Sequence, residues 1–255
     1  MSLDLGMVTA AAFFAGVVDA IVGGGGLITV PALFTTYPNM SPALLLGTNK
    51  CSSVFGTSVA ALNYARRVTL DWRWLWPATV AAFAGALLGA WTLTHMDPRL
   101  LRQLLPGILC AVLVYTLCNP RLGLTHAPRQ NVRHTLLITL VVGLLIGWYD
   151  GFFGPGTGSF FIFLLVRLVG LDFLHASAYA KVLNVATNLA ALLLLASVGQ
   201  VWWLAGLLMA AANVAGSLCG THLAIRHGAG LVRKLFILVV LALILKTGWP
   251  LMAGL

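Results

Sequence analysis

Long apolar segments recur from one end of the chain to the other, and they constrain the fold more than any other feature. Examples are Ala78–Leu93, Leu136–Ile146, Ala186–Val198 and Phe236–Leu245, each extended by apolar flanks. A helix of about 20 apolar residues crosses the roughly 30 Å hydrocarbon core of a bilayer. Only 8% of the residues are charged, against about 25% in soluble domains. The sequence therefore predicts an all-α polytopic membrane protein with the lipid bilayer as its surroundings.

An internal repeat runs through almost the whole chain. One constant shift of the sequence against itself places the scarce residue types on each other: Asp19 on Asp150, Lys50 on Lys181, and Trp72 on Trp203. The same shift aligns further positions without a gap, namely Gly16 with Gly147, Gly23 with Gly154, Gly25 with Gly156, Gly85 with Gly216, Gly89 with Gly220 and Arg102 with Arg233. We expect two homologous halves, residues 1–118 and 134–255, joined by a basic cytoplasmic linker, residues 119–133. Repeats of this kind are typical of transporters.

Each half has the same coarse plan. An apolar arm (Met7–Val22 or Leu136–Phe153) ends at a glycine-rich break and is followed by a second arm of about ten residues. At 1.5 Å per residue such an arm rises only about 15 Å, half of the bilayer core. Three longer helices then follow, near residues 43–64, 74–94 and 100–117 in the first half and 175–198, 201–224 and 232–252 in the second.

The broken segments could each be one span or a re-entrant hairpin, and the basic residues favour the hairpin. As single spans they divide the loop and end Lys and Arg residues 7 to 6, without an orientation signal. As hairpins they leave only Arg99, Arg102 and Lys246 on one side. The other side then holds Arg66, Arg67, Arg73, Arg121, Arg129, Arg133, Arg167, Arg226, Arg233 and Lys234. Basic residues gather on the cytoplasmic side of membrane proteins. The prediction is an inverted repeat: six spans, two opposed hairpins and both termini outside.

The glycine-rich breaks are candidate substrate-binding segments. Irregular backbone at membrane depth survives only where it is buried in protein or lines a cavity. The helix that follows each break offers free N–H groups and a dipole that favour an anion. The candidate residues are Gly23, Gly24, Gly25 and Gly26 in the first break and Gly154, Gly156, Thr157 and Gly158 in the second. The alternative is that these glycines only allow close helix packing.

Two lysines stand inside otherwise apolar helices. A lysine there costs about 2.5–3.5 kcal/mol on insertion scales, so Lys50 and Lys181 should face a cavity or a partner. We expect both to contact an anionic substrate together with Asn49 and Asn184, and we assign gating or coupling to Asp19 and Asp150. Two alternatives stay open. Each lysine could form a structural pair with the aspartate of its own half, which precedes it at the same spacing in both halves, or extend to the membrane surface.

Other patterns predict packing and exclude several chemistries. The pairs Gly85/Gly89 and Gly216/Gly220 have the small-xxx-small spacing of closely packed membrane helices. The six histidines and four cysteines have no metal-ligand spacing, and no catalytic motif is present. We therefore expect no metal, no cofactor, no catalytic residues and no nucleic-acid partner.

These segments resemble one family. The stretch from Gly16 to Pro31, the sequence Gly-Thr-Asn-Lys at 47–50, the stretch from Gly147 to Ser159 and the sequence Ala-Lys-Val-Leu-Asn at 180–184 are similar to the TauE/SafE (sulfite exporter-like) permeases, in particular the YfcA-like branch. The resemblance implies a bacterial inner-membrane permease for sulfur-containing anions such as sulfite, thiosulfate or organosulfonates.

The function predicted on these grounds is secondary transport of a small anion. An anion channel remains an alternative, because hairpins with glycine-rich tips also suit a pore. A membrane-embedded enzyme or assembly factor is a further alternative, although six scattered Asp residues offer little for catalysis. The sequence leaves the exact substrate, the direction of transport, a coupled proton and a homodimer open.

Overall fold

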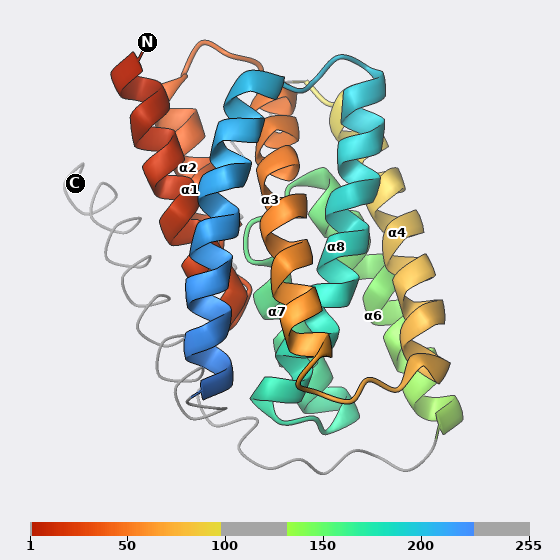
Figure 1. Ribbon diagram of the computed structural model, residues 1–255. Helices are drawn as coiled ribbons and strands as arrows, with labels where there is room; N and C mark the ends of the chain where they lie inside the picture. Colours follow the sequence, from red (N-terminus) through yellow and green to blue (C-terminus); the bar gives the residue numbers. More distant parts are fainter. Residues whose placement is uncertain (1, 98–131, 227–255) are drawn as a thin grey trace, which may run out of the picture.

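The computed structural model describes residues 2–97 and 132–226, and helices are the only regular elements in these two ranges (Figure 1). In chain order they are α1 (Ser2–Val22), α2 (Gly26–Thr36), α3 (Pro42–Ala65), α4 (Trp72–His95), α6 (Val132–Phe152), α7 (Thr157–Leu164) with the π-turn η1 (Leu165–Val169), α8 (Phe173–Ser197) and a last helix, Trp203–Arg226. The predicted helices at 100–117 and 232–252 and most of the predicted linker lie outside the described residues.

Five of these helices are long and apolar enough to cross a membrane: α1, α4, α6, α8 and Trp203–Arg226. The spans predicted near residues 74–94, 175–198 and 201–224 are among them. The arms before the two breaks, α1 and α6, are also long enough to cross, whereas the predicted span near 43–64, α3, is not among the five. Large apolar side chains such as Trp76, Leu88 and Trp91 are exposed on them, where a bilayer would cover them. The chain is thus a multi-pass membrane protein whose described residues form helices as their only regular elements.

Capping residues place the helix starts where the apolar segments begin. The side chain of Ser41 accepts a hydrogen bond from the amide of Leu44, and Pro42 occupies the first turn of α3. Asp71 caps α4 through the amide of Arg73, and Asp172 caps α8 through the amide of His175. The helices α3, α4 and α8 therefore start close to the positions expected from the sequence.

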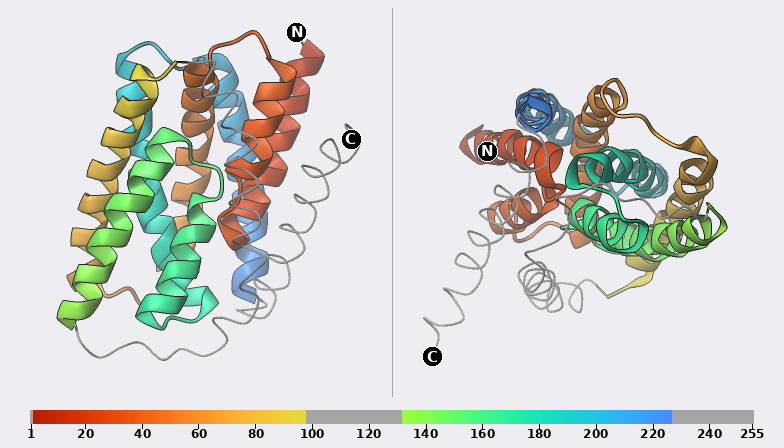
Figure 2. Two further views of the ribbon diagram at one scale, coloured as in Figure 1. Left: turned by 180° about the vertical axis from the view of Figure 1, so that it is seen from behind. Right: turned by 90° about the horizontal axis from the view of Figure 1, so that it is seen from below.

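The chain reverses direction at each glycine-rich break (Figures 1 and 2). Helix α2 packs against α1 and returns to the end of the bundle at which α1 began, and α7 returns beside α6 toward the opposite end. Gly23, Gly154 and Gly156 have φ of +78°, +96° and +83°, which only glycine adopts at low cost. Each reversal therefore depends on residues without a side chain.

Glycines allow two helix pairs to approach at backbone distance. A Cβ atom added to Gly89 of α4 would lie 1.9 Å from the carbonyl oxygen of Trp148 in α6. One added to Gly220 in the last helix would lie 2.4 Å from the carbonyl oxygen of Val17 in α1. The repeat aligns Gly89 with Gly220 and Val17 with Trp148, so the two contacts are equivalent. The predicted close-packing role of the small-xxx-small pairs is therefore confirmed.

Candidate functional site

The two glycine-rich breaks lie in direct contact with each other. The amide of Ser159, at the start of α7, donates to the carbonyl oxygen of Gly23 over 3.1 Å, and its hydroxyl donates to that of Val22 over 2.8 Å. A Cβ atom added to Gly23 would lie 2.3 Å from the carbonyl carbon of Gly158. The sequence did not single out Ser159, although it follows the break as a lone hydroxyl before an apolar run.

The first buried ion pair joins α3 to α6. Lys50 projects from α3, and its Nζ atom lies 2.8 Å from Oδ1 of Asp150 near the end of α6. Both side chains are 2% exposed. A Cβ atom added to Gly154 would lie 2.7 Å from this Nζ atom, so the second break borders the lysine amine.

The second buried ion pair joins α8 to α1. Nζ of Lys181 lies 3.0 Å from Oδ2 of Asp19 and also donates to the backbone carbonyl of Asp19. The same carboxylate oxygen accepts a hydrogen bond of 3.2 Å from the hydroxyl of Thr57 in α3. Asp19 is thus held by donors from two different helices.

The pairs are exchanged between the halves, which corrects one expectation. The sequence-based alternative paired Lys50 with Asp19 and Lys181 with Asp150, because each lysine follows the aspartate of its own half at the same distance. In the structure each lysine binds the aspartate of the other half. The physical reason is that the two breaks meet, so the end of each broken arm lies against a long helix of the opposite half. The expectation that the lysines could extend to the membrane surface is also wrong, since both are buried.

The two pairs differ in how completely their carboxylates are satisfied. Within the described residues, Oδ2 of Asp150 is buried and has no hydrogen-bond partner. The repeat places Asn188 where the first half has Thr57, the residue that satisfies Asp19. Asn188 instead donates to the backbone and side-chain oxygens of Asn184, over 2.8 and 3.2 Å. A buried polar atom without a partner costs about 1–3 kcal/mol, so the Asp150 carboxylate is less well satisfied than that of Asp19.

The other candidate residues lie in the two breaks or on the helices that carry the ion pairs. The side-chain oxygen of Asn49 accepts a hydrogen bond from Thr29 in α2, a residue that sequence reasoning missed. Thr157 donates to the carbonyl of Gly154 over 2.7 Å and stabilises the second break. A Cβ atom on Gly25 would lie 2.9 Å from the carbonyl oxygen of Ala15, so Gly25 contacts the α1 backbone.

Gly24, Gly26 and Gly156 complete the breaks and lie within the same buried region. A Cβ atom on Gly26 would lie 3.1 Å from Cα of Pro155 in the other break, and one on Gly24 would meet only ordinary contacts. Gly156 is the N-cap of α7. All the candidate positions thus belong to the breaks, the ion pairs or their immediate helices.

Comparison with known proteins gives a family match over most of the chain. Residues 8–247 match the model of the family described as "Sulfite exporter TauE/SafE". The chain is 37% identical over 227 residues to a "Probable membrane transporter protein" of Haemophilus influenzae, covering 89% of this chain and 88% of that protein. It is 38% identical over 236 residues to "Probable membrane transporter protein ORF9" of Sinorhizobium sp, covering 92% and 89%.

A third relative is "Probable membrane transporter protein YfcA" of Escherichia coli, 35% identical over 237 residues that cover 93% of this chain and 87% of that protein. No solved structure matches the chain significantly. The family match spans both breaks, both lysines and both aspartates. The chain belongs to the sulfite exporter TauE/SafE family of membrane transporters.

Proposed function

We propose that this protein is a secondary transporter in the bacterial inner membrane that moves a small sulfur-containing anion, such as sulfite, thiosulfate or an organosulfonate. The observation that carries the proposal is the pair of buried lysines held from opposite halves beside the two breaks. A buried ammonium group is expensive without compensation, and a substrate oxyanion can supply it. A charge-assisted hydrogen bond of this kind contributes about 1.5–3 kcal/mol.

The charges of the site suggest how binding and release proceed. The two lysines and two aspartates cancel formally, so an anion enters favourably only when one carboxylate leaves its lysine or takes up a proton. Asp150 is suited to this step because its second oxygen has no partner among the described residues, whereas Asp19 is held by Lys181 and Thr57. In the proposed cycle the substrate replaces Asp150 at Lys50, and Asp19–Lys181 stays closed.

The proposed membrane arrangement is six spans with two re-entrant hairpins of opposite orientation. Two observations support it: α1 with α2 and α6 with α7 return to opposite ends of the bundle, and the basic loops gather at one end. Inverted repeats with substrate sites at broken helices near the midplane suit alternating access.

Transport into vesicles tests the proposal directly. Purified protein in liposomes should accumulate labelled sulfite, thiosulfate or an organosulfonate against its gradient when a proton gradient is imposed. Lys50→Ala protein, checked for correct folding, is the matched control. Passive equilibration without uphill accumulation would favour the channel, and no movement of any tested anion would contradict the proposal.

A further inference from the structure

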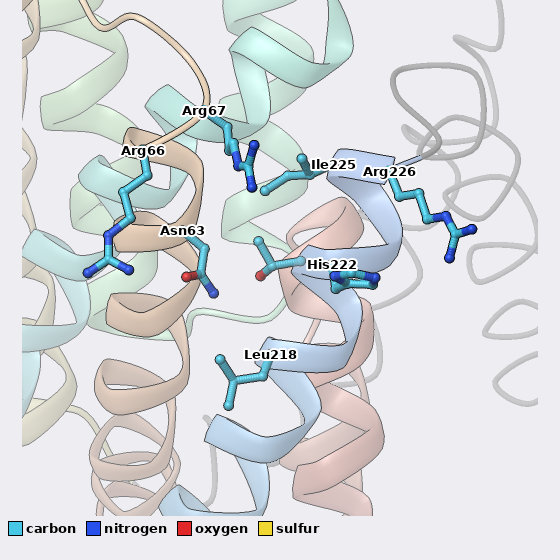
Figure 3. Close-up of a pocket in the computed structure, with 8 residues that line it drawn as sticks. Asn63, Arg66, Arg67, Leu218, His222, Ile225 and Arg226 are labelled. Carbon is cyan, nitrogen blue, oxygen red and sulfur yellow. The ribbon is translucent and has the colours of Figure 1, made fainter.

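A basic pocket lies where α3 and the helix Trp203–Arg226 end. It has a volume of about 560 Å³, and we call it the basic pocket (Figure 3). Its polar lining residues are Asn63, Arg66, Arg67, Thr221, His222 and Arg226. Figure 3 shows Arg67 between the two helices, while the side chains of Arg66 and Arg226 point outward on opposite sides of the pocket. A guanidinium group binds oxyanions through two parallel hydrogen bonds, so the chemistry of this pocket suits an oxyanion.

A row of buried polar residues leads from this pocket toward the ion pairs. Thr221, Ser217 and Asn213 are at most 3% exposed and follow each other at a spacing of four on one face of the last helix. We call these three residues the polar row. A Cβ atom added to Gly56 of α3 would lie 1.7 Å from Oδ1 of Asn213, so the row reaches α3 at that glycine. The next residue, Thr57, binds Asp19.

The other half of the protein lacks this row. The repeat aligns its three positions with Ala82, Ala86 and Ala90 of α4, all fully buried. Their equivalence is structural as well. A Cβ atom on Gly16 would lie 2.2 Å from the carbonyl oxygen of Asn213, and one on Gly147 would lie 2.3 Å from that of Ala82. Close packing does not require Asn, Ser and Thr at these three positions, because the alanines at the equivalent positions of α4 pack equally closely.

The pocket at the opposite end of the bundle is also different. It has a volume of about 390 Å³ and lies between the start of α3, the end of α4 and the turn after α8. Its polar lining residues are Ser41, Thr94, His95 and Gln200, and neither lysine nor arginine is among the described residues that line it. Of these two pockets, only the one at the end with the basic loops combines a cationic lining with a polar route inward.

We propose that the basic pocket captures an oxyanion at the cytoplasmic end and that the polar row passes it inward, past the closed Asp19–Lys181 pair, toward Lys50. The inference rests on the proposed function and adds a route, a side and residues to it. A solute oxyanion and the phosphate of a lipid headgroup present the same oxygens to the pocket, but only a solute can continue along the polar row. The row offers hydroxyl and amide groups that replace water around the moving anion, and the alanines of the other half offer none.

Binding and transport by the full chain test the pocket. In liposomes of phosphatidylcholine, Arg67→Gln combined with Arg226→Gln should raise the half-saturating thiosulfate concentration at least tenfold when thiosulfate is supplied on the membrane side to which the pocket opens. The half-saturating concentration measured from the opposite side of the membrane should stay unchanged. The control carries Arg73→Gln and Arg167→Gln, which remove the same charge from exposed positions at the same end of the bundle. Equal effects of the two double variants, or equal effects on both faces, would overturn the capture site.

A second type of liposome separates the two sources of the oxyanion. The same measurements are repeated in liposomes that contain phosphatidylglycerol. A pocket effect in pure phosphatidylcholine identifies the solute as the ligand. An effect that occurs only with phosphatidylglycerol identifies a lipid headgroup and overturns the role of the pocket as an entry for substrate.

The polar row has its own test. Ser217→Ala and Asn213→Ala together leave every residue that lines the pocket unchanged, and they should lower the maximal transport rate at least tenfold while thiosulfate binding at the pocket is kept. Thr139→Val in α6 is the control, because that hydroxyl is also buried and bonded only within its own helix. An unchanged rate would overturn the route.

If wild-type protein moves no sulfur oxyanion, the proposed function fails. If wild-type transports but the variants match their controls, only this inference fails.

Discussion

At the residue scale, the two buried ion pairs hold the centre of the protein together across its halves. Each pair has one partner on a long helix and the other at the end of a broken arm. Removing one partner of a buried pair leaves an uncompensated charge and costs about 3–5 kcal/mol. Replacing both partners of one pair by apolar side chains of similar volume costs much less.

This difference gives a prediction about partner identity. Lys50→Met should destabilise the protein by about 3–5 kcal/mol, and Lys50→Met with Asp150→Leu should recover most of the loss. The same lysine change with Asp19→Leu should add a second loss, because Asp19 belongs to Lys181. Thermal unfolding of the detergent-purified variants measures the coupling. Better recovery with Asp19 than with Asp150 would contradict the exchanged pairing.

A second prediction concerns Asp150 alone. Asp150→Asn leaves Lys50 with a neutral partner and removes the carboxylate to which the proposed cycle assigns release of Lys50 or uptake of a proton before an anion binds. Binding of thiosulfate should persist, while the dependence of transport on a proton gradient should disappear. Asp97→Asn, at an exposed position, is the control and should keep that dependence. An Asp150→Asn protein that still requires the gradient would place coupling elsewhere.

The sequence predicts the two lysines of the site but not their partners. Lysine within an apolar helix is recognisable by its cost alone, so Lys50 and Lys181 were predicted to be central. Their partners were not, because spacing along the chain does not say which arm faces which helix. Among the described residues Oδ2 of Asp150 has no hydrogen-bond partner and Asn188 bonds to Asn184, and no sequence pattern reports such side-chain contacts.

At the element scale, the glycine faces set how closely the helices approach. The sequence predicted this for Gly85, Gly89, Gly216 and Gly220 from spacing alone. It did not predict that the opposing contacts are backbone carbonyl oxygens, because the crossing of two helices is a property of the pair.

The glycine faces give a prediction about packing. Gly89→Leu should separate α4 from α6 and lower the unfolding temperature by at least several degrees, because the new Cβ would lie 1.9 Å from the oxygen of Trp148. Gly6→Leu is the matched control, since nothing lies within 4 Å of a Cβ atom at that position. Equal unfolding temperatures for the two variants would contradict the close approach. Thermal unfolding in detergent checks both.

At the scale of the whole molecule, the repeat predicted from scarce residues reappears as matched helix contacts. The two halves nevertheless differ in chemistry, since polar residues line one seam and alanines the other. The repeat gives the shared framework, and the substitutions within it give the polar row that we propose as a route. Only the framework follows from aligning the halves, because the importance of a substitution depends on what it faces.

The arrangement in the membrane leads to the last prediction. If α1 and α2 form a re-entrant hairpin, the start of α1 and the turn before α3 lie on one side of the membrane, and the turn after α3 lies on the other. If the broken segment is one span, the start of α1 and the turn before α3 lie on opposite sides.

Single cysteines at Leu3, Asn39 and Thr69, all exposed positions, distinguish these arrangements in a cysteine-free background. An impermeant maleimide applied to intact cells should label Leu3→Cys and Asn39→Cys but not Thr69→Cys, which should react only after the membrane is opened. The positive loops support this orientation, because Arg66 and Arg67 precede Thr69 and basic loops stay in the cytoplasm. Labelling of Leu3→Cys without Asn39→Cys would instead establish a single span.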